Sequence, residues 1–523
     1  NLNADGSFNY SPAADFQGTE TFTYVASDGN SDSAAAEVSL FVGQPPVRIS
    51  EVLVANATSI ETRVRASVDD SFKGDRTTPD WIELQNLTSS ELDISGFHLT
   101  DNDNNLTKWA FPAGTMIAGN GYLVVAATRL DITNTDLDES GMLHTNFKLN
   151  PSGEYLAITS PDGVVFDEFA PEYPDQRADI SYGIGSDGTV GYLREISPNG
   201  PNGGLYAGMV TDTAFSIDRG YYTEPFQVEV STAFEDAQIR YTTDGSAPTA
   251  THGEVYSAPI TISDTTVLRA VAVKENYIAS NVDAQTYVFA ASVFQQDGAE
   301  LNSARWGHAG PDWQMDPIII NHEDPEIRPE LDDLQRIPTV SLSLDFDEFF
   351  GSKGIYIRGE NVEKPISFEF FDPNKPDNGI QANSTVQIVG GSSPNRWKSD
   401  KLSMRVRFTE DQGPSDLNYP VFGADAISQF DTLVVDARLN NVWHYGGGSD
   451  PDGQRGRGQY MRDEFAADLQ NAVGGYATHG QHVHVYINGI YWGMHTLHER
   501  PDDNFMASYH GGVSEDYNVI KHG

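Results

Sequence analysis

The chain has 523 residues, and its 32 Lys and Arg residues against 76 Asp and Glu residues give a formal net charge of −44. Such a negative field repels nucleic acid and anionic membranes, which argues against a nucleic-acid-binding function. The sequence contains no cysteine, so disulfide frameworks, thiolate zinc sites and cysteine nucleophiles are excluded. No apolar run approaches the ~18 residues that a transmembrane helix needs.

Residues 1–44 alternate polar and apolar side chains between turn residues such as Asp5-Gly6, which predicts short antiparallel strands. The run from Asn3 to Pro12, followed by Phe16 to Tyr24, resembles the second half of bacterial cadherin-like repeats. Those repeats occur in tandem on large secreted or surface proteins. The resemblance implies that the segment is the C-terminal part of such a β repeat. Pro45-Pro46 then predicts a stiff linker to the next unit.

Residues 47–205 are rich in short, β-prone runs between turn residues, which predicts a second all-β unit. Its motifs resemble the lamin-tail domain, an Ig-like β-sandwich: Asp80-Trp81-Ile82-Glu83-Leu84, Ile94-Ser95-Gly96, Phe111-Pro112, Gly121-Tyr122-Leu123 and His144-Thr145-Asn146-Phe147. The resemblance implies a binding or spacing module with no chemistry of its own.

Residues 206–290 form a third predicted β unit. The segment Tyr241 to Thr249, which reads YTTDGSAPT, resembles the small C-terminal β-sandwich of chitobiase-type hexosaminidases. Only this accessory module is present, so glycosidase activity does not follow. Contact with carbohydrate and a role as a spacer both stay open.

From Ile337 the pattern becomes mixed α/β. Gly354-Ile355-Tyr356-Ile357 is one of several expected strands, and apolar residues at helical spacing predict a helix from Tyr460 to Ala472. Two β-prone runs flank Asn488-Gly489, which is the strongest short-range signal for a tight hairpin. The second run leads through Leu497 into the polar turn that begins at Glu499.

A glycine turn with two hydroxyls, Gly390-Gly391-Ser392-Ser393, is followed by the strand that carries Lys401. Glycines let backbone N–H groups approach phosphate oxygens, and a lysine supplies a point charge, so the pattern suits a phosphate cradle. The same residues are also typical of an ordinary hairpin turn, and the Walker spacing is absent.

The helix predicted after Tyr460 carries Asp463 and Glu464 in its first turn. Such an acid can pair with a lysine on a neighbouring sheet and hold it, as in protein kinases. Alternatively, the two acids complement the helix dipole on a solvated face.

Histidines cluster at positions 479, 482, 484, 495 and 498. They could ligate zinc, but no H-E-x-x-H or carboxylate–histidine spacing supports a metal site. A decorated strand surface is the preferred interpretation, and no metal ligand is predicted.

Residues 337–523 carry further motifs that, taken in order, resemble the N-terminal part of a spore-coat CotH-type kinase domain: Gly354-Ile355-Tyr356, Val386-Gln387-Ile388, Tyr419-Pro420-Val421-Phe422-Gly423, Tyr460-Met461-Arg462-Asp463, Tyr486 to Gly493, Glu499-Arg500 and Asp516 to Lys521. That family has an atypical protein-kinase-like fold. Its characterised members phosphorylate secreted or coat proteins, using ATP and a divalent metal, Mg or Mn.

The resemblance also implies roles for individual residues. The catalytic candidates are Lys401, as the phosphate-contacting lysine, and Glu464, with Asp463 as the alternative, as its helical partner. The cofactor-binding candidates lie near the phosphates or border the adenine as the hinge: Gly390, Gly391, Ser392, Ser393, Leu497 and Glu499. The metal-binding and catalytic aspartates are expected beyond residue 523, so residues 1–523 alone are expected to be inactive.

The sequence therefore predicts a multidomain, mainly β protein of Ig-like β-sandwiches followed by an incomplete α+β protein-kinase-like domain. The expected function is transfer of phosphate from ATP to a protein, at an extracellular or cell-surface location. The alternative is a non-catalytic adhesin, scaffold or carbohydrate-binding surface protein with a pseudokinase fold. The expected partners are a protein substrate, an extracellular-matrix or cell-surface partner, or carbohydrate, and not nucleic acid.

Overall fold

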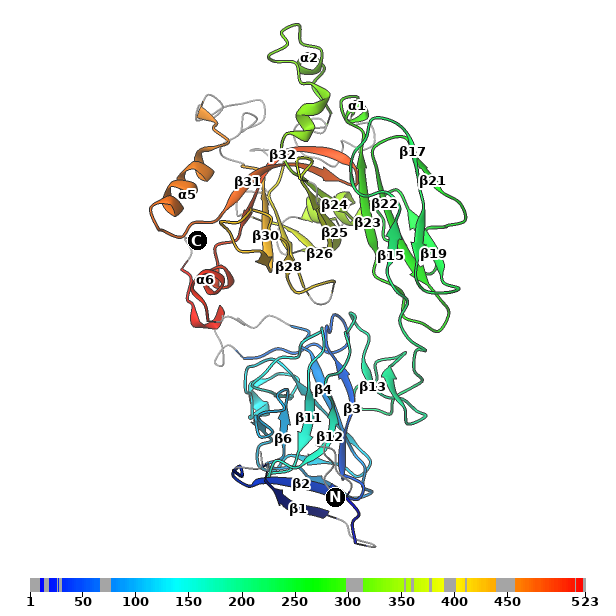
Figure 1. Ribbon diagram of the computed structural model, residues 1–523, viewed down its shortest axis with the longest axis vertical. Helices are drawn as coiled ribbons and strands as arrows, with labels where there is room; N and C mark the ends of the chain where they lie inside the picture. The colour runs from blue at the N-terminus through cyan, green and yellow to red at the C-terminus, as the bar shows by residue number, and fades with distance from the viewer. Residues whose placement is uncertain are drawn as a thin grey trace. The chain divides into compact units, whose positions relative to one another are not determined.

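The computed structural model divides the chain into two compact units, Asn1–Gly208 and Met209–Gly523. Both units are built mostly from β-strands (Figure 1). The residues that the structure describes are 10–13, 18–25, 27, 31–65, 77–297, 314–351, 354–358, 362–375, 379–389, 401–409, 412–438, 457–512 and 514–520.

The first unit begins with an antiparallel pair, β1 (Gly18–Tyr24) and β2 (Ala36–Val42). A β-sandwich follows, with one sheet in the order β10-β9-β4-β3-β13-β14 and the other in the order β12-β11-β6-β7. Its strands are β3 (Val47–Leu53), β4 (Trp81–Asn86), β6 (His98–Thr100), β7 (Trp109–Ala110), β9 (Tyr122–Ala126), β10 (Leu143–His144), β11 (Leu156–Thr159), β12 (Val165–Phe169), β13 (Tyr182–Ile184) and β14 (Val190–Tyr192). A further short pair joins β5 (Leu92–Asp93) to β8 (Met116–Ile117).

The core of this sandwich consists of apolar side chains from both sheets. Ile82 and Val125 from the larger sheet and Leu99 and Ile158 from the smaller one are fully buried in one cluster. Inward-facing apolar residues of both sheets therefore form the core, as in the Ig-like sandwich that the lamin-tail resemblance implied.

The second unit begins with a smaller sandwich. Its main sheet has the order β16-β23-β22-β19-β20, and two antiparallel pairs, β15-β18 and β17-β21, accompany it. The strands are β15 (Thr213–Phe215), β16 (Gly220–Tyr221), β17 (Phe226–Val228), β18 (Val230–Thr232), β19 (Gln238–Thr242), β20 (Glu254–Val255), β21 (Ile260–Ile262), β22 (Thr266–Val273) and β23 (Asp283–Val288). Leu268 and Tyr287 lie at the centre of its core.

A closed barrel follows the small sandwich, with the strand order β24-β25-β26-β27-β30-β32-β31. Its strands are β24 (Thr339–Ser343), β25 (Glu363–Phe371), β26 (Ile380–Ile388), β27 (Met404–Arg407), β30 (Thr432–Asp436), β31 (Gly480–Ile487) and β32 (Ile490–Glu499). The first strand lies parallel to β31, and the other neighbours are antiparallel. The sequence indicated strands here, but it did not indicate that they close on themselves.

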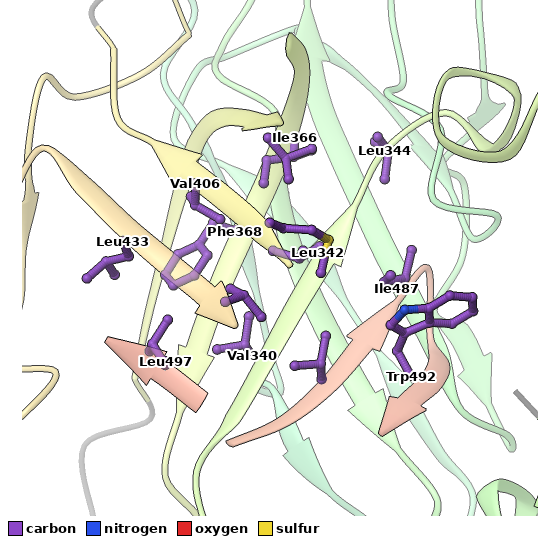
Figure 2. Packing of buried hydrophobic residues seen from close by; sticks show 14 of the residues in the cluster. Val340, Leu342, Leu344, Ile366, Phe368, Val406, Leu433, Ile487, Trp492 and Leu497 are labelled. Carbon is purple, nitrogen blue, oxygen red and sulfur yellow. The ribbon is translucent and has the colours of Figure 1, made fainter. Parts of the chain in front are cut away.

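The barrel is filled by side chains from nearly every strand. Figure 2 shows Val340, Phe368, Val406, Leu433 and Leu497 together in this core, each from a different strand. Since all five are at most 1% exposed, the barrel interior is a packed core rather than a channel.

Short helices complete the second unit: α1 (Ala290–Val293), α2 (Pro317–Ile320), α3 (Phe346–Phe350), α4 (Ile355–Arg358), α5 (Arg462–Ala472) and α6 (Asp503–His510). The prediction of a strand at Gly354-Ile355-Tyr356-Ile357 is wrong, because α4 occupies it. Tyr356 packs its ring against Phe350 and Trp492, so tertiary packing overrides the β propensity of the segment. None of the helices that the structure describes is long and apolar enough to cross a bilayer.

Helix α5 confirms the helix predicted between Tyr460 and Ala472. Its apolar spacing does not mark a buried face, however. Phe465 and Leu469 remain 68% and 56% exposed.

The predicted hairpin at Asn488-Gly489 is confirmed, and β31 and β32 flank it. Both turn residues have positive φ, 50° and 78°, the backbone that a two-residue primed turn requires. The Asn488 side chain also accepts from Leu344 N and donates to Leu344 O, both at 2.9 Å. These bonds continue the pairing between β24 and β31 by one step past the end of β31.

Candidate functional site

A largely buried arginine links the end of β30 to the first turn of α5. The Arg438 side chain is 9% exposed, and its Nη1 donates to Asp463 Oδ2 at 2.6 Å. Its Nη2 contacts the carboxylate of Glu464, the next residue of the helix. One cation therefore holds both acids of the first helical turn against the barrel.

The barrel fixes this arginine from the other side. Arg438 Nε donates to Thr496 Oγ1 on β32 at 3.1 Å, and Arg438 N donates to Asp436 Oδ1 at 2.8 Å. Ser403, just before β27, donates its hydroxyl to the same Asp436 oxygen at 2.8 Å. Arg438 has a φ of 54°, and this left-handed backbone directs the chain out of the strand. Side chains of β30 and β32 thus set its position, and Ser403 supports one of them.

Two histidines border this cluster. Burial lowers the pKa of His482, with Arg438 adding to the effect, and burial also lowers the pKa of His498. His498 Nε2 lies 3.9 Å from Asp436 Oδ2. Because the neutral form of both rings is favoured, Arg438 supplies the positive charge facing Asp436, Asp463 and Glu464.

The glycine turn is predicted to lie beside the phosphates, but Gly390, Gly391, Ser392 and Ser393 lie outside the described residues. The described flanks of the segment meet, because Val389 N donates to Ser403 O at 3.0 Å. Ser403 in turn bonds to Asp436, so the base of this loop adjoins the Arg438 cluster.

Lys401 and Glu464 have different described contacts from those expected. The Lys401 ammonium lies 4.1 Å from the ring centroid of Trp492. Glu464 meets Arg438, because β30 leads into the segment before α5 and ends beside the first turn of that helix. Glu464 is thus paired with Arg438 in the described structure, and its pairing with Lys401 stays a prediction. The phosphate-contacting role of Lys401 stays a prediction.

The two hinge candidates lie at the end of β32. Leu497 is fully buried in the barrel core. Glu499 is 2% exposed, and its carboxylate accepts from His479 N at 2.7 Å and from the Tyr509 hydroxyl at 2.8 Å. It therefore ties the end of β32 to α6 and to the residue that precedes β31. A cavity of about 190 Å³ adjoins it, lined by Glu499, Arg500, Asp431, Asn504 and Phe505 among others. The adenine contacts of both residues stay predictions.

The histidines of β31 and β32 bond to protein groups. His484 Nδ1 lies 3.0 Å from the Tyr491 hydroxyl, and its Nε2 lies 3.4 Å from Asp333 O. Burial lowers the pKa of His484 to about 4. In the described part of the chain, no three His, Cys, Asp or Glu side chains are grouped closely enough to hold a metal ion.

Arg438, Asp436 and Ser403 were not predicted from the sequence as site residues. A signal for the first was present: the apolar run Thr432-Leu433-Val434-Val435 is followed at once by Asp436-Ala437-Arg438, the last such run before the predicted helix. A cation at the end of that run, ahead of a helix that begins with two acids, is a candidate partner for those acids.

Comparison with known families gives the classes of domain that the chain contains. The chain is a multidomain protein in which Ig-like domains accompany a CotH-like domain. Residues 1–41 match the family described as Bacterial Ig domain, residues 43–172 the Lamin Tail Domain, residues 217–284 the Chitobiase/beta-hexosaminidase C-terminal domain, and residues 387–523 the CotH kinase protein family. This is the predicted order. The first match carries the description Bacterial Ig domain, whereas the motifs of that segment resemble a cadherin-like repeat. No curated protein matches the chain.

Proposed function

We propose that the barrel and α5 form the nucleotide-binding part of a kinase-like domain that transfers phosphate from ATP to a protein. The observation that carries the proposal is the pairing of Arg438 with Glu464. In protein kinases a lysine on the strand before the αC helix pairs with a glutamate of that helix, and the pair positions the ATP phosphates. Arg438 and Glu464 form a pair of the same kind, between the end of β30 and the first turn of α5.

The residues around this pair suit the phosphates of ATP. A guanidinium binds phosphate oxygens through paired N–H donors, and Asp463 and Glu464 hold it in place. Ser403 adjoins the described flank of the glycine turn, whose backbone N–H groups would complete the cradle. Bound Mg or Mn would neutralise phosphate charge during transfer.

Nucleotide binding tests the proposal directly. We expect the chain to bind ATP with Mg or Mn, and Arg438→Met to weaken that binding about tenfold to a hundredfold, since it removes charge-assisted hydrogen bonds. Titration calorimetry measures the affinity. Arg240→Met is the matched control, because Arg240 donates to Gly253 O in the small sandwich. Equal ATP affinity in the wild type and the folded Arg438→Met variant would contradict the proposal.

A second candidate is a non-catalytic adhesin or scaffold, or a carbohydrate-binding surface protein. The β-sandwich units that precede the barrel favour it, as does the match of residues 217–284 to an accessory module of carbohydrate-active enzymes. Retention of the chain on chitin without ATP binding would favour this candidate. In either case we propose an extracellular or cell-surface location, with a protein or a glycan as the partner.

A further inference from the structure

The small sandwich of the second unit and the barrel share a buried interface. Strand β22 of the sandwich has six consecutive buried residues, so both of its faces are covered. Leu268, Ala270 and Ala272 fill the sandwich core, whereas the alternate residues Val267, Arg269 and Val271 belong to the other face. In Figure 1 the sandwich strands, in green, lie beside β24 and β25 of the barrel.

A glutamate of the barrel lies at the centre of this interface. Glu369 on β25 is fully buried, and its Oε1 accepts from Arg219 Nε and from Thr286 N, both at 3.0 Å. Its other oxygen accepts from the Thr286 hydroxyl. Arg219 and Thr286 both belong to the sandwich. A buried carboxylate without such partners is strongly destabilising, so Glu369 requires the sandwich to be in place.

Hydroxyl groups extend the polar contact along β24. Val340 and Leu342 of this strand lie in the barrel core, while Thr339 and Ser341 belong to its outer face and are nevertheless fully buried. Ser341 Oγ lies 2.8 Å from Thr286 Oγ1, and Thr339 Oγ1 lies 2.8 Å from the Tyr221 hydroxyl. Polar side chains that would face water on a free barrel are therefore paired with the sandwich.

Apolar and backbone contacts surround these polar groups. A cluster that includes Val288 and Val293 on the sandwich side and Phe371 and Tyr486 on the barrel side closes one edge. Gln296, after α1, bonds to both backbone groups of Tyr491, its Oε1 accepting from N at 2.9 Å and its Nε2 donating to O at 3.0 Å.

The tip of the β31–β32 hairpin also meets the sandwich. A Cβ at Gly245 would come within 2.3 Å of the Asn488 side chain, so only glycine permits this close approach. The φ of 86° at Gly245 favours glycine for a second reason.

We propose that the small sandwich and the barrel are a single cooperative folding unit, in which the sandwich is a fixed wall of the kinase-like domain. A glycan-binding accessory module would keep its sheet face open to ligand. Here the face of β22 and β23 toward the barrel is closed, so it is not available to carbohydrate. The inference does not depend on nucleotide binding, because it rests only on this interface.

Hydrogen exchange of the full chain, followed by mass spectrometry, tests the proposal. The informative peptides cover β22 in the sandwich and β24 in the barrel, and a peptide covering β4 in the first unit is the internal reference. We expect Glu369→Gln to speed exchange about tenfold or more in β22 and β24 alike, since one interface holds both strands, and to leave β4 unchanged.

Glu363→Gln is the matched control. Glu363 lies on the same strand as Glu369, but it is paired with Arg405 and Arg407 and is 26% exposed, so its loss leaves exchange in β22 unchanged. Faster exchange in β24 with unchanged exchange in β22 for Glu369→Gln would overturn the proposal. Should that variant fail to fold, Thr286→Val removes the hydroxyl shared by Glu369 and Ser341, and the same comparison of the two strands applies to it.

Discussion

Two fully buried glutamates, one in each unit, show two ways in which a fold accommodates the same side chain. Glu369 of the barrel lies against Arg219, an arginine from the neighbouring sandwich. Glu83, on β4 of the first unit, is held by the neutral donors Ser50 Oγ and Asn199 N, at 2.6 Å and 2.5 Å. Burial raises the pKa of Glu83 to about 7, and Glu51, which lies opposite on β3, adds to the effect. Burial alone therefore does not decide how a carboxylate is stabilised. The charge of its partner does.

The largest effect is expected from removing the counter-charge. Arg219→Met removes the arginine that is bonded to the buried Glu369 and leaves only the electrostatic interaction with Arg269, which should lower the free energy of unfolding of the second unit by about 3 kcal/mol at pH 7. Urea unfolding, monitored by hydrogen exchange in β24, measures the loss of stability. Arg240→Met on β19 is the control. A loss below about 1 kcal/mol, or one equal to that of the control, would show that the pair is not what stabilises the interface.

The second effect is a dependence of stability on pH, and it concerns Glu83, which neutral donors hold. Because the folded state raises the pKa of Glu83 from 4.5 to about 7, it favours the protonated form. The resulting stabilisation is complete below about pH 4.5 and is lost as the pH rises through 7. The loss amounts to roughly 3 kcal/mol for this group. Glu83→Gln should therefore make the first unit more stable at pH 8 and weaken its pH dependence.

Urea denaturation at pH 5 and pH 8, monitored by hydrogen exchange in β4, measures the pH dependence of the stability of the first unit. If the wild type and Glu83→Gln lose the same stability between the two pH values, Glu83 is not the group responsible.

The smallest effect is expected at an exposed acid. Glu139 lies 3.5 Å from Arg63, and both side chains are about half exposed, at 53% and 47%. Glu139→Gln should change the unfolding free energy of the first unit by less than about 0.5 kcal/mol, since water screens the pair. The same urea titrations measure it. A change above about 1 kcal/mol would mean that this exposed ion pair stabilises the fold more than solvent screening allows, and would contradict the expected order of effects.

Local signals were sufficient for the parts of the fold that depend on neighbouring residues. The Asn488-Gly489 turn and helix α5 were predicted from short patterns and are present. Closure of the barrel was not predicted, since it depends on β24 pairing in parallel with β31 across about 140 intervening residues. The alternating Thr339, Ser341 and Ser343 of β24 have the pattern of a solvent-facing side, and nothing in that pattern shows that another module covers it.

The candidate site also has a part that local sequence signals predicted and a part that they did not. The acids of α5 were identified, because their position in the first turn of a helix is a local feature. Their cation was not, because Arg438 reaches them only through the geometry of β30 and of the strands beside it. Lys401 was proposed as their partner because it belongs to a recognisable motif. Membership of a motif is weaker evidence of a contact than proximity in the fold.

The position of the β31–β32 turn bears on how this protein can be engineered. Tight β-turns are usual places for a peptide tag or a fluorescent label, but Asn488 and Gly489 lie against Gly245 and Thr265, and an insertion there would push the small sandwich off the barrel. A Cβ at Gly188, in the turn between β13 and β14, would meet no atom within 4 Å, so that turn suits such a label.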